Sequence, residues 1–525
     1  MESLFQSINA LFRFIQPISD GVWNFPLQLD WYAQIPVLGQ LSFAVLLLTG
    51  SGVWFTLRTA GVQWLSARRA FAIMRRQRRS ATGISATASF LLGLAMRVGP
   101  GNIVGVTGAI AVGGPGALFW MWVAAAFGMA TAFVESVLAQ LFKERKQDEF
   151  VGGMPYYGQR LLGNRRWVGV TLAGAFIVYA LFNVPSQTFN IFTAIGLLAD
   201  TATGAQSGRQ SPLYYGIAIG LVLSCAWLIL GGIRRVTHWT NRLVPGMASL
   251  FCSLSLLIIL FNLPLLPDFF RLVFGGAFAP DALFGGSIGI AIAEGVRRGL
   301  MSNEAGQGTI TMAAAVADND HPCEQGFVQA MGVFFDTLVI CTLTGFIVVL
   351  AHLWTDSASS AEWAAASAAR LDVYVASVQA LTPDVLDRAL VMLVCACYAL
   401  FAFTTLLGMI SFAEISANLI SRSPRFILGI RVLGSLVFVP FGALTVLAGL
   451  ELGNLWAITD LTNILMVYMN IPLLLLGAPL VYQALAHYRA TDGGKFLSER
   501  IGVQTAHWVA SEQRHLPDTE ETSPR

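Results

Sequence analysis

Long apolar runs, each about the length of a membrane-crossing helix, recur along the chain and are separated by short polar links. A transmembrane helix needs about 20 consecutive apolar residues, because it must cover a hydrocarbon core about 30 Å thick. The pattern therefore predicts an all-α polytopic membrane protein. Its eleven transmembrane helices are expected near 36–57, 83–113, 117–142, 167–199, 212–232, 243–263, 284–304, 326–352, 386–419, 426–449 and 455–487.

Basic residues gather in every second link, and the link 58–82 alone holds seven. Of the 32 Lys and Arg residues, 26 lie in these links and the C-terminal tail, a group in which we count Arg297 and Arg298. Five lie in the other links and the N-terminal segment, and Arg97 falls inside a predicted helix. Because cytoplasmic loops carry the excess of positive charge, we expect the N-terminus outside and the C-terminus in the cytoplasm.

Composition agrees with a membrane protein, since 55% of the residues are hydrophobic and only 12% are charged. A soluble domain carries about 25% charged residues. Residues 1–24 hold a single basic residue and lack the pattern of a signal peptide, so we expect a short amphipathic helix at the membrane surface. The six cysteines lie mostly in apolar runs and predict neither a disulfide nor a zinc site.

The apolar run 83–113 is interrupted at residues 97–103. Pro100 lacks a backbone N–H, and Gly99 and Gly101 impose no side-chain constraint, so a regular helix is not expected to continue. In hydrocarbon an unwound segment survives only where protein or a bound ligand satisfies its backbone groups. We therefore predict two half-helices around a binding site, with a kink used only for packing as the alternative.

A second interrupted helix is expected at 284–304, where glycines recur from Gly285 and Gly286 through Gly289 to Gly299 and the run continues to Gly306. It lies five helices after the first, so it crosses the membrane in the opposite direction. This offset is typical of two five-helix halves related by inverted topology, with the two broken helices side by side at the midplane.

The chain is accordingly divided into five parts. They are an amphipathic N-terminal segment (1–35), an extra transmembrane helix with a basic cytoplasmic link (36–82), a first five-helix repeat (83–263), a second five-helix repeat (284–449 and 455–487) and a polar cytoplasmic tail (488–525).

Several motifs resemble the alanine or glycine:cation symporter family, also called the sodium:alanine symporters. The matching stretches are 98–106 (VGPGNIVGV), 113–122 (GGPGALFWMW), 302–306 (SNEAG), 335–342 (FDTLVICT) and 401–405 (FAFTT). The resemblance covers about residues 85–485. It implies a ten-helix core of the leucine-transporter type, preceded here by one extra helix, that takes up a small neutral amino acid together with sodium.

By this resemblance, backbone groups at Gly99, Gly101 and Asn102 would bind the carboxylate of the amino acid. The resemblance likewise implies a sodium site made of two carbonyl oxygens and two hydroxyl groups, those of Ala95, Val98, Thr404 and Thr405. Sodium is a hard cation that prefers such oxygen ligands. The alternative for the two threonines is hydrogen bonding to their own helix.

Three positions depart from the family pattern, which usually has threonine at Pro100, often glutamine at Ala88 and commonly tryptophan at Met409. Because the last two positions line the family's substrate pocket, we expect more room here, with Met409 as an adaptable apolar wall. A larger neutral amino acid such as glutamine, or serine, is therefore expected besides alanine or glycine. The remaining candidates for substrate contact are Gln187, Gly285, Gly286 and Phe403, and Asn183 has the chemistry to join them.

Charged residues within membrane segments are functional candidates, because burying them is costly. Arg97 is expected to form a gate or a structural ion pair with Glu135, Glu294, Asp336 or Glu414. Asn303 and Glu304 are candidates for an inner gate, and Asp336 is a possible second cation ligand.

The prediction is a sodium-coupled importer of a neutral amino acid in the bacterial plasma membrane, in contact with lipid and without a nucleic-acid partner. Sequence leaves the oligomeric state open. A proton-coupled transporter using Glu135 or Glu294 is the alternative. An enzyme is disfavoured because the six histidines are scattered, and a channel because no repeated filter motif is present.

Overall fold

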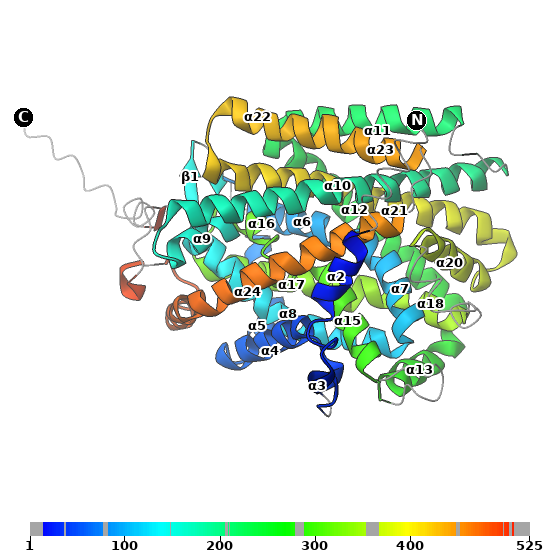
Figure 1. Ribbon diagram of the computed structural model, residues 1–525, viewed down its shortest axis with the longest axis horizontal. Helices are drawn as coiled ribbons and strands as arrows, with labels where there is room; N and C mark the ends of the chain where they lie inside the picture. Colours follow the sequence, from blue (N-terminus) through cyan, green and yellow to red (C-terminus); the bar gives the residue numbers. More distant parts are fainter. Residues whose placement is uncertain are drawn as a thin grey trace, which may run out of the picture.

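The computed structural model describes residues 14–35, 38–76, 82–147, 149–204, 208, 211–278, 288–352, 367–447, 452–496, 498–502 and 507–508. Figure 1 shows a bundle in which the long helices α10, α21 and α24 run along the longest axis. The α-helices are α2 (Ile15–Trp23), α3 (Asp30–Ala33), α4 (Phe43–Arg58), α5 (Val62–Arg75), α6 (Ala86–Arg97), α7 (Val104–Gly113), α8 (Gly116–Leu141), α9 (Met154–Leu161), α10 (Arg166–Thr203), α11 (Pro212–Leu230), α12 (Gly232–Phe261), α13 (Leu266–Phe278), α15 (Ile288–Asn303), α16 (Thr311–Ala315), α17 (Pro322–Val333), α18 (Thr342–Ala351), α20 (Ser367–Ala380), α21 (Asp384–Ile420), α22 (Pro424–Val432), α23 (Val439–Leu447) and α24 (Leu452–Ala490).

Shorter elements join these helices. Four 3₁₀ turns and two π-helical segments occur within the described residues: Leu38–Gln40, Pro100–Asn102, Leu263–Leu265 and Ser498–Ile501, then Phe334–Cys341 and Leu433–Phe438. The link after α8 forms an antiparallel hairpin of β1 (Glu144–Lys146) and β2 (Glu149–Val151), with Arg145 opposite Phe150. Among the described residues, the regular elements are helical apart from this hairpin and an isolated β-bridge between Ile84 and Ala317. The hydrophobic pattern alone does not predict the hairpin.

Eight helices of the described chain are long and apolar enough to cross a membrane, and up to ten spans result if each of two bent pairs counts as one. The bent pairs are α4 with α5, at 75°, and α6 with the segment that ends in α7, at 62°. A polytopic membrane protein is thus confirmed. The count of eleven stays a prediction, since the described part of the segment 284–304 is α15, which has only 16 residues.

The first broken helix lies where the sequence predicts it. α6 ends at Arg97, the turn Pro100–Asn102 follows, and α7 begins at Val104. A Cβ at Gly99 would lie 2.6 Å from the hydroxyl oxygen of Thr405 on α21. Glycine is required there because the unwound segment packs directly against a neighbouring helix.

The second interrupted helix leaves helical geometry at its end. Its first two glycines, Gly285 and Gly286, lie outside the described residues. α15 runs to Asn303, and the chain then leaves helical geometry until α16, with φ values of 56°, 92° and 80° at Glu304, Gly306 and Gly308. Two closely spaced glycines that accept a positive φ explain why the helix stops there.

The place where the second interrupted helix ends corrects the prediction that Arg297 and Arg298 lie on the basic side of the bundle. Both precede the break, on the half-helix that packs near Gly113 and Ala117 at the other end of the bundle. A helix was expected to continue through them to the basic side, whereas α15 has already ended at Asn303.

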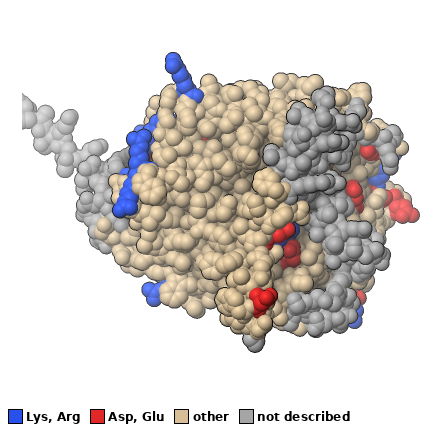
Figure 2. Space-filling view, viewed as in Figure 1, with Lys and Arg blue, Asp and Glu red and all other residues tan. Residues whose placement is uncertain are grey.

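Apolar side chains cover the outside of the bundle, as a lipid-facing surface requires. Among the spanning helices, α11, α12 and the segment from α22 to α23 have the smallest buried fractions, so they lie at the periphery of the bundle. α8, the segment from α17 to α18, and α21 are the most buried. Figure 2 shows a broad uncharged belt, with Lys and Arg gathered toward the end where Figure 1 places β1 and α9.

Candidate functional site

A cavity lies where the two broken helices meet. Five segments form its walls: the first break, the middle of α10, the end of α15, the middle of α21 and the start of α24. The lining residues are Met96, Arg97, Gly99, Pro100, Gly101, Tyr179, Asn183, Gln187, Met301, Glu304, Thr405, Met409, Thr459 and Asn463.

The amide side chain of Asn102 holds the first break in shape. Its Oδ1 accepts a hydrogen bond from the backbone N–H of Gly99 at 2.8 Å. Its Nδ2 donates to Asp336 Oδ1 at 2.6 Å and to Ser302 Oγ at 3.0 Å. The side chain of Asn102 is therefore buried away from the cavity, and it links the first break to α15 and to the π-helical segment that contains Asp336.

The hydroxyl group of Thr405 faces the first half-helix. Thr405 Oγ1 lies 3.3 Å from the carbonyl oxygen of Ala95, 3.4 Å from that of Met96 and 3.0 Å from that of Phe401. Three carbonyl oxygens and one hydroxyl thus converge between α6 and α21. Oxygen-rich surroundings of this kind suit a hard cation.

The neighbouring Thr404 points elsewhere. Its hydroxyl donates to the carbonyl oxygen of Phe401 at 3.1 Å and lies 3.6 Å from the sulfur of Met247 on α12. The structure therefore brings Ala95 together with Thr405 but not with Thr404. Val98 is fully buried beside the break.

Arg97 ties the two broken helices together. Its Nε donates to the carbonyl oxygen of Asn303 at 2.9 Å, and its Nη1 donates to the carbonyl oxygen of Gln329 at 3.0 Å. Within the described chain no carboxylate lies within 4.0 Å of this guanidinium. Two of the carboxylates that were expected to pair with Arg97 instead pair with other arginines: Glu294 pairs with Arg298, and Glu414 pairs with Arg431.

Asn303 and Glu304 form the turn of the second break. Asn303 Oδ1 accepts from the N–H of Ala305 at 3.0 Å, and Glu304 Oε2 accepts from the hydroxyl of Thr309 at 2.7 Å. Glu304 also lines the cavity. Both residues therefore lie at the second break, between the two halves of the helix.

Glu135 on α8 supports the same turn. Its Oε2 accepts hydrogen bonds from the N–H of Gly308 and from Asn470 Nδ2, both at 3.2 Å. Its Oε1 is buried and has no hydrogen-bond partner among the described residues.

Besides Asn102, four expected substrate contacts lie away from the cavity lining or outside the described residues. Ala88 is in the first turn of α6, where its N–H is capped by Ser85 Oγ at 3.1 Å. Nine residues of helix, or about 13 Å, separate it from Arg97 at the break. Phe403 is half-buried and does not line the cavity. Gly285 and Gly286 lie outside the described residues.

The sequence did not identify Met96, Tyr179, Met301, Thr459 and Asn463 as lining residues. Thr459 and Asn463 are four residues apart, so they share one face of α24. Polar residues at this spacing in an apolar helix are a signal that identifies an inward face. Tyr179 and Met301 carry no comparable signal.

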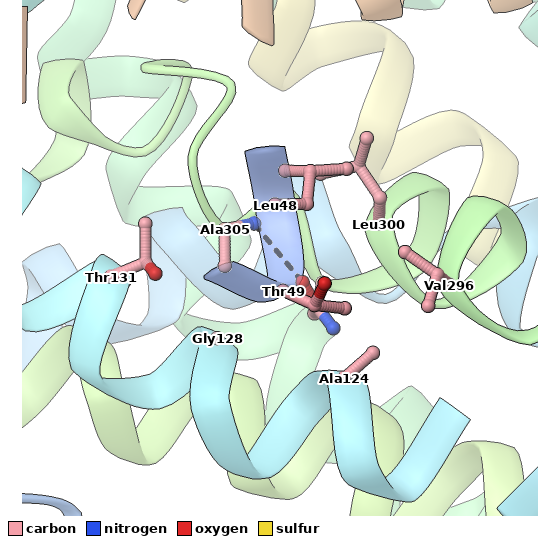
Figure 3. A pocket seen from close by; sticks show the side chains of 9 residues that line it. Leu48, Thr49, Ala124, Gly128, Thr131, Val296, Leu300 and Ala305 are labelled. Carbon is pink, nitrogen blue, oxygen red and sulfur yellow. Dashed lines mark hydrogen bonds between the residues drawn. The ribbon is translucent and has the colours of Figure 1, made fainter. Parts of the chain in front are cut away.

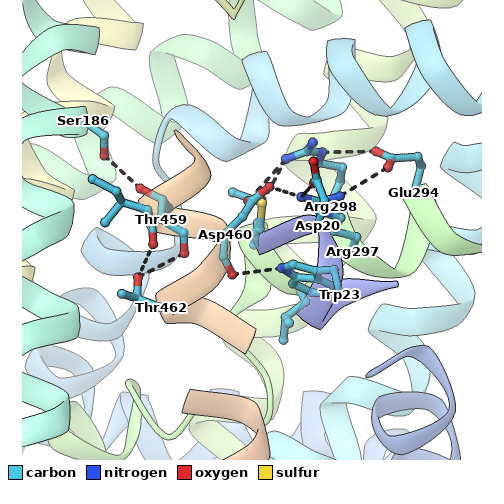
Figure 4. Close-up of polar contacts among 12 residues, drawn as sticks. Asp20, Trp23, Ser186, Glu294, Arg297, Arg298, Thr459, Asp460 and Thr462 are labelled. Atoms are coloured by element: carbon cyan, nitrogen blue, oxygen red, sulfur yellow. Dashed lines mark hydrogen bonds and ion pairs between the residues drawn. The ribbon is translucent and has the colours of Figure 1, made fainter. Parts of the chain in front are cut away.

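An ion-pair network next to the cavity joins α15 to α24 (Figure 4). Arg297 pairs with Asp460, which directly follows the cavity-lining Thr459. Helix α2 closes over this pair. Trp23 Nε1 donates to the carbonyl oxygen of Asp460 at 2.9 Å, and Asp20 Oδ1 lies 3.9 Å from Arg297.

A second pocket, drawn in Figure 3, lies between α4, α8 and α15 and shares Asn303 and Ala305 with the second break. Most of its lining is aliphatic, and none of the lining side chains is charged. It therefore lacks groups that would pair with the charges of an amino acid.

Residues 31–498 match the model of a family described as "Sodium:alanine symporter family". Two relatives from Bacillus subtilis (strain 168) are each 34% identical to the chain. "Amino-acid carrier protein AlsT" aligns over 442 residues, which are 84% of this chain and 88% of the relative. "Probable sodium/glutamine symporter GlnT" aligns over 456 residues, which are 86% of this chain and 89% of the relative.

A solved structure titled "Crystal structure of MhsT in complex with L-phenylalanine" resembles the chain with a TM-score of 0.50. The likeness covers 82% of this chain and 95% of that chain, at 13% sequence identity. At this identity it concerns the fold alone, which is of the leucine-transporter-like kind that the sequence predicts.

Proposed function

Because the chain belongs to the sodium:alanine symporter family, we propose that it imports a neutral amino acid together with sodium by alternating access. Membership of this family makes it an amino acid transporter and not an enzyme. Sodium coupling, the choice of substrate and the direction of transport are the parts that we propose.

The proposal for the substrate site rests on two buried amide oxygens. Asn183 Oδ1 and Gln187 Oε1 belong to cavity-lining residues of α10, and neither has a hydrogen-bond partner among the described residues. A buried polar atom without a partner costs about 1–3 kcal/mol, so this arrangement favours a bound ligand that donates hydrogen bonds. The ammonium group or a side-chain amide of an amino acid provides such donors.

The first break supplies the complementary end of the site. Gly99 and Gly101 line the cavity, and α7 begins just beyond them. The start of a half-helix carries partial positive charge and exposed amides, which suit a carboxylate. We propose that the carboxylate of the substrate lies at this break and that its side chain extends toward Met409.

The proposed sodium site is centred on Thr405. Its hydroxyl and the carbonyl oxygen of Ala95 are within 3.3 Å of each other, so a cation between α6 and α21 would be bound by groups already held together. Val98 remains a candidate for a further carbonyl ligand. Thr404 would have to turn away from Met247 to join them.

We propose a substrate somewhat larger than alanine or glycine, such as glutamine or serine. Met409 lines the cavity where the family commonly has tryptophan, and a flexible thioether adapts to ligands of different shape. Ala88 does not contribute to this inference, because it lies away from the cavity. One relative is named as a probable sodium/glutamine symporter, which supports the larger substrate.

Alternating access would use two five-helix repeats of inverted topology within eleven transmembrane helices. We propose that the pair of Arg297 and Asp460 closes the cavity on one side, because it joins two of the cavity walls. We also propose a bacterial inner-membrane location, with the N-terminus outside and the C-terminus in the cytoplasm.

Proton coupling is the second candidate, and Glu135 favours it. One carboxylate oxygen of this fully buried residue lacks a partner among the described residues, as expected for a group that binds a proton during transport.

Uptake into proteoliposomes tests these proposals. We expect saturable uptake of labelled neutral amino acids when an inward sodium gradient is imposed, and none when choline replaces sodium. Uptake driven equally well by a proton gradient without sodium would contradict sodium coupling. Absence of uptake for every neutral amino acid would contradict the substrate class.

A further inference from the structure

A third pocket lies far from the substrate cavity, at the end of the bundle where Lys and Arg gather (Figure 2). It is formed by β1, α9, the start of α10, the last turn of α21 and the link that follows α21. The side chains that matter for its chemistry are those of Glu144, Tyr156, Gln159, Arg160, Arg166 and Arg422.

The lining has an excess of positive charge. Glu144 is shared by two guanidinium groups, since its Oε1 lies 3.1 Å from Arg160 Nη2 and its Oε2 pairs with Arg422. Arg166 makes no ion pair with the carboxylates that the structure describes. Three arginines thus face one carboxylate in the same pocket.

A buried hydroxyl group provides a second, independent observation. Tyr156 is only 3% exposed, and its hydroxyl oxygen has no hydrogen-bond partner within the described chain. Burial raises the pKa of the Tyr156 phenol, so the group stays protonated and available as a donor. An unsatisfied donor among arginines suits an anionic acceptor that enters the pocket.

The geometry of these donors favours a phosphate group. A guanidinium group presents parallel N–H donors that match two oxygens of a phosphate, and a phenol adds a single directed donor. A carboxylate ligand would use fewer of the available donors, because it has only two oxygens.

The position of the pocket relative to the membrane indicates which kind of molecule supplies the phosphate. α10 begins at Arg166 and α21 ends at Ile420, so the pocket lies at the ends of two spanning helices. Trp167 follows Arg166 directly and is 64% exposed. An exposed tryptophan at a helix end is typical of the headgroup region of a membrane.

We propose that this pocket binds the phosphate group of an anionic phospholipid. The bound headgroup would connect the β-hairpin and α9 to α10 and α21, the two helices that carry Gln187 and Thr405 at the substrate cavity. The proposal goes beyond amino acid symport and does not depend on it.

Thermal unfolding of the purified full-length protein in detergent micelles tests it. Phosphatidylglycerol, phosphatidylcholine and inorganic phosphate are added separately to the natural chain and to Arg166→Gln, Tyr156→Phe and Arg425→Gln. Arg425 is exposed, lies near the pocket in sequence and does not line it, so it controls for the loss of one positive charge.

We expect phosphatidylglycerol to raise the Tm of the natural chain and of Arg425→Gln, with little effect of the other two additives. Arg166→Gln should weaken phosphatidylglycerol binding about fivefold, and Tyr156→Phe should also weaken it. Equal effects of both lipids, or equal losses in Arg166→Gln and Arg425→Gln, would overturn the proposal. Stabilisation by inorganic phosphate alone would overturn the lipid as the source of the phosphate.

If Arg166→Gln does not fold, the response of Tyr156→Phe to phosphatidylglycerol tests the proposed site. It removes one hydroxyl group without changing the net charge, and an unchanged response to phosphatidylglycerol would then contradict the proposed site.

Discussion

Arg97, at the end of α6, donates a hydrogen bond of 2.9 Å to the backbone carbonyl oxygen of Asn303, at the end of α15. These residues are the last helical positions before the two breaks. One buried side chain therefore joins the half-helices that frame the substrate cavity.

Arg97→Lys should lower the uptake rate at least about tenfold. Lysine keeps the charge but lacks the planar fork that reaches Asn303 and Gln329 together, so one buried carbonyl loses a charged hydrogen bond. Initial rates of uptake in proteoliposomes measure the effect, with Arg425→Lys as the exposed control. A wild-type uptake rate in Arg97→Lys would show that this link between the half-helices is dispensable.

Thr405→Ala should raise the sodium concentration needed for half-maximal uptake about tenfold, because it removes the hydroxyl beside the Ala95 carbonyl. Thr404→Ala should have a much smaller effect, since its hydroxyl faces Met247. Sodium titrations of uptake compare the two, and Thr405→Ser should retain near-natural affinity. Equal effects of both alanine variants would argue against a sodium site centred on Thr405.

Gln187→Leu should weaken substrate binding about tenfold, the cost of one or two hydrogen bonds, while sodium affinity stays the same. The substitution keeps the approximate shape of the side chain and removes the unpartnered Oε1 that lines the cavity. The measurement is the KM for the best substrate. Thr203→Ala, exposed at the end of the same helix, is the control. An unchanged KM would place the substrate elsewhere.

Asp460→Asn should open the contact between α15 and α24, because it removes the charge of the carboxylate that lies closest to Arg297. We expect faster labelling of a cysteine at Thr459→Cys by a membrane-impermeant thiol reagent. Asp268→Asn, which affects the exposed pair with Arg271 on α13, serves as the control. If labelling is equally fast with and without Asp460→Asn, this pair does not close the cavity.

Stability should rise with pH between about 7 and about 10.5 through Lys143. Burial lowers the pKa of this amine from 10.5 to about 7 in the folded chain. The unfolded chain then binds more protons in that range, so the contribution to stability is complete above the unfolded pKa and is lost as the pH falls toward 7.

Lys143→Met should flatten this pH dependence, because methionine fills the space beside Phe150 and Trp508 without a titrating group. Thermal unfolding across the pH range measures it. The exposed Lys495 provides the control Lys495→Met. Parallel pH profiles for the natural chain and Lys143→Met would rule out Lys143 as the cause.

Some of the cavity could be predicted from local sequence and some could not. Pro100 between two glycines identified the first break, because proline and glycine act on the backbone wherever they stand. The second interrupted helix was predicted over 284–304 without a single break position, and the described chain leaves helical geometry after Asn303. An apolar segment rich in glycine offers several places to unwind, and its neighbours decide which one is used.

The membrane class, the family and the first broken helix can be recognised from the residues alone, because hydrophobicity, motif spacing and backbone preference are local properties. Helix packing is needed to show that Thr405 and not Thr404 faces Ala95, that Asn102 bonds to Asp336, and that Ala88 lies away from the cavity. Adjacent helical residues point about 100° apart. Which of them meets a partner hundreds of residues away depends on how the helices pack.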